Sequence, residues 1–130
     1  MINFLKQYWL STLVIVIILI LCFMNTAPLP KVPMRDFDKV VHTIMFLGLS
    51  GVIFFDSTNY LRFPISKQQI FWGVFLFPTV LGGLIEILQG ALTATRSADL
   101  FDFIFDVVGT IFGLGIALFI NRYFLEKKIA

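Results

Sequence analysis

The amino-acid sequence predicts an all-α fold, a polytopic membrane four-helix bundle, and three observations support this prediction. Of the 130 residues, 58% are hydrophobic and only 14% are charged, and the mean hydropathy is +0.93, whereas soluble domains are about 25% charged. Four apolar stretches each approach the ~20 residues that a helix needs to cross a membrane. The connections between them are short, so neighbouring spans are expected to run antiparallel.

The spans are expected over residues 8–25, 37–55, 70–89 and 100–120, within a single domain that covers residues 1–130. Helix is the predicted state because lipid cannot satisfy exposed backbone groups. No small-x-small cleavage site follows the first span, so we expect it to be retained rather than removed as a signal peptide. Pro78 is expected to kink the third span, and Gly109, Gly113 and Gly115 are expected to allow close packing of the fourth.

Composition and charge exclude several classes of protein. The chain is too apolar for a soluble enzyme, and it lacks the basic surface of a nucleic-acid binder. Cys22 is the sole cysteine, so the chain cannot form an internal disulfide. Lysine and arginine are divided six to four between the two ends of the predicted bundle, with the larger group on the side of the termini. By the positive-inside rule, both termini are expected in the cytoplasm.

Polar side chains gather at the opposite end, where the second span begins, the third ends and the fourth begins. On the fourth span, spacings of three, three and four residues form one helical stripe: Arg96, Asp99, Asp102 and Asp106. Ionisable groups at membrane depth cost about 2.5–3.5 kcal/mol each, so they are expected to face one another. The sequence therefore predicts an outward-opening polar pocket with these ligand-binding candidates: Asp38, Lys39, His42, Glu86, Gln89, Arg96, Asp99, Asp102 and Asp106.

A structural role is the alternative for each of these residues. Asp99 can cap the start of the fourth helix, and Lys39 and Arg96 can extend to the interface as anchors. The remaining polar side chains can hydrogen-bond between helices. Because the whole set is concentrated at one end, we favour a functional pocket.

Carboxylates outnumber basic groups in this pocket. Either the deepest carboxyl, Asp106, stays protonated, or a cation or cationic ligand completes the site. A metal site built from His42, Glu86 and Asp102 would have one histidine and no cysteine, a weak signature for a transition metal, so we expect no metal and no cofactor. Ser97 has no patterned base beside it, so a serine nucleophile is not expected.

Three short motifs resemble the VanZ-like family: Asp38-Lys39-Val-Val-His42, Glu86-Ile-Leu-Gln89, and Arg96-Ser-Ala-Asp99-Leu-Phe-Asp102 followed by Gly109. The resemblance covers nearly the whole chain, in the right order and at matching membrane depth. It implies a small membrane protein of the bacterial cytoplasmic membrane, related to one that confers low-level resistance to the glycopeptide teicoplanin. Asp106 departs from the pattern, because relatives commonly have asparagine there.

From these observations we expect a protein that binds or shields a membrane lipid, a lipid-linked envelope precursor or an amphiphilic antibiotic. Lys39 and Arg96 would hold an anionic group such as phosphate, and Asp102, Glu86 and His42 would bind an amine or a hydroxyl. The alternative is a membrane-embedded enzyme that modifies a lipid head group, with His42 and a carboxylate as its acid–base pair. Binding is preferred because residue types alone do not establish a reaction.

Overall fold

The computed structural model describes residues 2–24, 37–92 and 100–129, although the side chains at 2, 37, 38 and 125–129 are outside the description. Within these ranges all regular structure is helical, which confirms the predicted all-helical fold. The elements are α1 (Ile2–Gln7), α2 (Trp9–Phe23), α3 (Phe37–Ser57), α4 (Lys67–Gln69), the π-helical segment η1 (Ile70–Leu76), α5 (Phe77–Leu92) and α6 (Leu100–Ile129).

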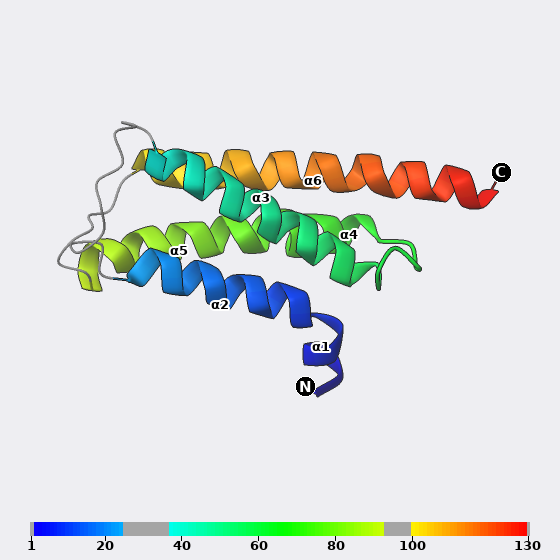
Figure 1. Cartoon of the computed structure of the whole chain (residues 1–130), viewed down its shortest axis with the longest axis horizontal. Helices are drawn as coiled ribbons and strands as arrows, with labels where there is room; N and C mark the ends of the chain where they lie inside the picture. The colour runs from blue at the N-terminus through cyan, green and yellow to red at the C-terminus, as the bar shows by residue number, and fades with distance from the viewer. Residues whose placement is uncertain (1, 25–36, 93–99, 130) are drawn as a thin grey trace.

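The long helices lie side by side, and α1 bends away from α2 (Figure 1). α5 ends and α6 begins near one end of the molecule, α6 runs from there to the other end, and α1 lies nearer the middle of the long axis (Figure 1). Three stretches in the described residues are long and apolar enough to cross a membrane: 39–57, 67–92 and 100–124. Many of their large apolar side chains are exposed, as lipid-facing surfaces would be.

The backbones of α3 and α6 approach each other closely at two glycines. A Cβ atom at Gly109 would collide with the carbonyl oxygen of Thr43, and one at Gly113 would collide with that of Leu47. Gly115, by contrast, faces open space. The predicted close packing therefore holds at Gly109 and Gly113, four residues apart, and it fixes how α6 lies on α3.

Pro78 was expected to kink the third span, and the structure has the π-helical segment η1 on its N-terminal side. In η1 each backbone N–H bonds to the carbonyl oxygen five residues earlier rather than four. The Phe77 N–H, for example, bonds to the Trp72 carbonyl oxygen. Pro78 has no N–H for the carbonyl of Val74. Ser50 on α3 donates its hydroxyl to that oxygen at 3.0 Å, so the buried carbonyl has a partner on a neighbouring helix.

The end of α3 differs from the prediction, because the helix continues past Phe55 to Ser57 and Asp56 is fully buried. Oδ2 of Asp56 accepts hydrogen bonds from the backbone N–H of Ser11 at 2.9 Å and from its hydroxyl at 2.8 Å. Ser11 lies in the first turn of α2, where N–H groups lack partners within the helix. The helix dipole also favours a negative charge there. Asp56 thus caps α2 from a different helix.

Candidate functional site

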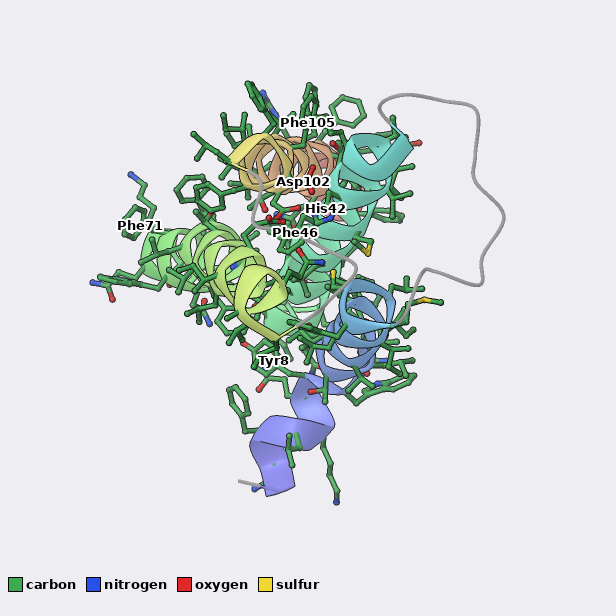
Figure 2. The ribbon with its side chains drawn as sticks, turned by 90° about the vertical axis from the view of Figure 1, so that its left-hand side faces the viewer. Tyr8, His42, Phe46, Phe71, Asp102 and Phe105 are labelled. Carbon is green, nitrogen blue, oxygen red and sulfur yellow. The ribbon has the colours of Figure 1, made fainter. Side chains whose placement is uncertain are left out.

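A buried histidine–aspartate pair joins α3 to α6. His42 Nδ1 lies 2.7 Å from Oδ1 of Asp106, and the two residues are 1% and 0% exposed. His42 comes in the second turn of α3, and Asp106 lies on the stripe of α6 that faces it. Figure 2 shows His42 and Asp102 between α3, α5 and α6. The pairing of two residues 64 positions apart in the sequence ties the two helices together at this end.

Two more carboxylates surround the same imidazole ring. Oε1 of Glu86, from α5, lies 4.0 Å from His42 Nδ1, and Oδ2 of Asp102 lies 3.9 Å from Nε2. We name His42, Glu86, Asp102 and Asp106 the polar cluster. Lys39 extends it toward the surface, since its Nζ lies 3.9 Å from Oδ1 of Asp102 and its side chain is 23% exposed.

The polar cluster holds more negative than positive groups. Its three carboxylates face one imidazole ring and the ammonium of Lys39. Buried charges are tolerated only where partners or ligands compensate their lost hydration. The arrangement is therefore suited to bind a positively charged group, or to move a proton between His42 and a carboxylate.

Gly82 on α5 makes room for the carboxylate of Asp106. A Cβ atom at Gly82 would lie 2.9 Å from Oδ2 of Asp106 and 3.1 Å from its Cβ. Oδ2 is buried and has no hydrogen-bond partner among the described residues. The position of Gly82 against Asp106 therefore determines where that carboxylate can lie.

The structure brings together five of the nine predicted ligand-binding residues: Lys39, His42, Glu86, Asp102 and Asp106. Gln89 is buried, and its Nε2 donates to the backbone oxygen of Cys22 at 2.9 Å, which links α5 to α2 as the structural alternative expected. Arg96, Asp99 and the side chain of Asp38 lie outside the described residues.

The polar cluster is more enclosed than the outward-opening pocket that the sequence predicts. Glu86 and Asp102 are only 5% and 7% exposed. A cavity of about 520 Å³ lies instead near the opposite end, between α2 and η1, lined by Tyr8, Ser11 and Trp72 among others. Lys39 and Asp102 form the side of the polar cluster nearest the surface, so a ligand would reach it there.

The buried carboxylate of Asp56 was not predicted from the sequence, because the expected second span ended at residue 55. The spacing of buried residues along α3 could have indicated that Asp56 is buried. Phe46, Leu49 and Ile53 are buried at helical intervals, and Asp56 falls on the same stripe three residues later. That periodicity indicates a buried position even though the side chain is charged.

No protein-family model and no solved structure matches this chain. An uncharacterized protein of Schizosaccharomyces pombe is 31% identical over 116 residues, which cover 88% of this chain and 64% of the relative. The chain thus spans a little less than two thirds of the length of the relative that it matches.

This relative is eukaryotic, and it argues against the predicted location in the cytoplasmic membrane of a bacterium. That prediction was wrong because the bacterial location was taken from the resemblance. Hydropathy indicates that the chain lies in a membrane, but it does not distinguish a bacterial membrane from a eukaryotic one. The three apolar helices support a membrane association. Glycopeptide resistance has no support in the fold or in this relative.

Proposed function

We propose that this chain crosses the membrane four times and binds the polar head group of a lipid or a lipid-linked molecule through Lys39 and the polar cluster. The observation that carries the proposal is the meeting of charged side chains from three apolar helices in one layer, with Lys39 on the side nearest the surface. Ionisable residues are rare inside membranes, and where they occur they commonly belong to ligand or ion sites.

In the proposed complex the head group enters beside Lys39 and Asp102. The ammonium of Lys39 binds an anionic group such as phosphate, and the carboxylate of Asp102 accepts a hydrogen bond from an amine or hydroxyl. His42 lies behind Asp102, with Nε2 3.9 Å from Oδ2. The acyl chains remain against the apolar faces of the helices. The VanZ-like resemblance is proposed as a family assignment, supported by the meeting of His42, Glu86 and Asp102 from three separate motifs.

Four spans require that α2 also crosses the membrane. This helix has 15 residues, about 22 Å at 1.5 Å per residue. It lies alongside α3 and α5, and Gln89 bonds to its backbone. An apolar helix that packs along two membrane-length helices is best accommodated as a short fourth span.

The test is native mass spectrometry of the protein extracted gently from its membrane. We expect wild type to carry a lipid or lipid-linked species that the double variant Lys39→Gln/Asp102→Asn loses. The control, Lys67→Gln/Asp56→Asn, makes the same two changes at the opposite end and should retain it. Equal lipid content in all three proteins would contradict the proposal.

A second candidate function is acid–base modification of a lipid head group, and the 2.7 Å contact between His42 and Asp106 favours it. A carboxylate beside an imidazole orients the ring and stabilises its protonated form, as in many general bases. Asp106→Asn would then reduce turnover about 10²–10⁴-fold. Mass spectra of lipids from cells that express wild type or Asp106→Asn separate the candidates: a new lipid mass made only by wild type indicates an enzyme.

A further inference from the structure

Three potential metal ligands meet inside the polar cluster. His42, Glu86 and Asp106 come from three different helices and are all buried, and one ligand atom of each lies within 4.8 Å of the others. Nδ1 of His42 is 2.7 Å from Oδ1 of Asp106 and 4.0 Å from Oε1 of Glu86. Neighbouring ligands of a small divalent ion, each at about 2.0–2.2 Å from it, lie about 3 Å apart. Small side-chain movements would bring these atoms to that spacing.

An independent observation at Asp106 also indicates a ligand. Its side chain is completely buried, yet Oδ2 has no hydrogen-bond partner among the described residues. A buried carboxylate oxygen without a partner is strongly disfavoured unless an ion or a proton completes it. Oδ1 of this carboxylate faces His42, and Oδ2 lies beside Gly82 on α5, the helix that also carries Glu86.

The second nitrogen of His42 fits a metal ligand as well. Histidine ligands commonly point their other ring N–H toward a carboxylate, which fixes the ring and makes the coordinating nitrogen more basic. Here Nε2 faces Oδ2 of Asp102 at 3.9 Å, on the opposite side of the ring from Nδ1. Asp102 would therefore orient His42, while Nδ1 binds the ion.

We propose that His42, Glu86 and Asp106 bind one divalent transition-metal ion, such as Zn²⁺ or Mn²⁺. An imidazole nitrogen with two carboxylates suits these ions better than Mg²⁺ or Ca²⁺, which prefer oxygen ligands alone. A double positive charge would also balance the excess of carboxylates around His42. This departs from the expectation drawn from sequence, which grouped His42 and Glu86 with Asp102 and judged the set too weak.

The metal site goes beyond the proposed lipid binding and does not require it. The proposed ligands of the ion are His42, Glu86 and Asp106, whereas the proposed head-group contacts are made by Lys39 and Asp102. Metal content and lipid content are measured separately. A protein that binds metal and no lipid would contradict only the proposed function, and one that binds lipid and no metal would contradict only the metal site.

The experiment uses the full chain without a histidine tag, purified in detergent, stripped with EDTA and then dialysed against Zn²⁺ or Mn²⁺. Bound metal is quantified by inductively coupled plasma mass spectrometry, and affinity is measured by competition with a chromophoric chelator. We expect about one equivalent in wild type and at least tenfold weaker binding in Glu86→Gln and Asp106→Asn. Asp56→Asn, a change at a buried carboxylate outside the polar cluster, should bind like wild type.

Two results would overturn the proposal. One is that wild type retains no metal after dialysis, which needs no variant and so does not depend on variant folding. The other is that Glu86→Gln and Asp106→Asn, each monodisperse and helical by circular dichroism, bind as much metal as Asp56→Asn with equal affinity. Metal bound in wild type and Asp56→Asn but lost in the two cluster variants supports the site.

Discussion

Asp106 is held in place by a residue that has no side chain. A Cβ on Gly82 would lie only 2.9 Å from Oδ2 of this carboxylate, so the position of Oδ2 depends on that glycine. The polar cluster therefore depends on steric room as well as on charge.

Gly82→Ala is expected to move the Asp106 carboxylate without changing any polar group. We expect a loss of about 1–3 kcal/mol in stability from overpacking, measured by thermal unfolding in detergent, together with weaker metal binding. The matched control is Gly73→Ala, because a Cβ there meets no atom within 4 Å. An unchanged melting temperature and metal affinity in Gly82→Ala would contradict this prediction, because the Asp106 carboxylate would then be able to move away from the added methyl group at no cost.

Most of the described polar cluster could be anticipated from residue spacing. The stripe through Asp102 and Asp106 and the depth of His42 and Glu86 follow from helical periodicity. Which carboxylate touches the imidazole could not be anticipated, because that depends on the rotation of α6 against α3. That rotation is set by the contacts of two glycines of α6 with Thr43 and Leu47. The sequence does not indicate which residues of α3 the glycines contact.

At the scale of the helices, α6 carries glycines that contact α3 and a glycine that does not, and their alanine variants can be compared. Gly109 and Gly113 face the backbone of α3, whereas Gly115, on the same helix, faces open space. Gly109→Ala is expected to destabilise the protein by about 1–3 kcal/mol, and Gly115→Ala is expected to be neutral or slightly stabilising, because alanine favours helix. Thermal unfolding of the two variants in the same detergent checks this. Equal melting temperatures would contradict the close approach.

The attachment of α2 depends on Asp56. Removing its carboxylate in Asp56→Ala leaves the N–H and hydroxyl of Ser11 without their buried acceptor, and we expect a loss of about 2–4 kcal/mol. Ser11→Ala should cost about 1 kcal/mol. Thr12→Ala serves as the control and should have little effect, because the exposed Thr12 hydroxyl donates to the carbonyl oxygen of Tyr8, the residue just before α2. With Trp72 replaced by phenylalanine, fluorescence of Trp9, which donates to the hydroxyl of Tyr60, reports detachment of α2. A melting temperature for Asp56→Ala equal to that of Thr12→Ala would contradict this role.

Helix positions were easier to predict from sequence than the irregular turns. The expected spans at 37–55, 70–89 and 100–120 overlap α3, the η1–α5 segment and α6, because apolar length alone locates them. The turn after α3 could not be foreseen. Asn59, Tyr60 and Leu61 have φ values of 48°, 61° and 64°, a conformation that sequence propensity disfavours for tyrosine and leucine. The bond between Trp9 and Tyr60 accompanies that conformation.

At the scale of the whole molecule, the proposed four spans would place both ends of the chain on one side of the membrane. Cysteines introduced at Asn3 and Lys127, with Cys22 replaced by serine, should therefore react equally with a membrane-impermeant maleimide in sealed vesicles. A cysteine at Lys31, in the first connection between spans, should show the opposite accessibility. Opposite labelling of Asn3→Cys and Lys127→Cys would instead indicate three spans, with α2 outside the hydrocarbon core.

The shortness of α2 has a consequence for the surrounding lipid. If α2 is the proposed fourth span, a helix about 22 Å long beside spans that match a ~30 Å core creates a hydrophobic mismatch on one flank of the protein. Lipids along that flank must shorten or tilt, at a cost of a fraction of a kcal/mol per Å. The protein is therefore expected to partition into the thinner of two coexisting bilayers and to act there as a local thickness sensor.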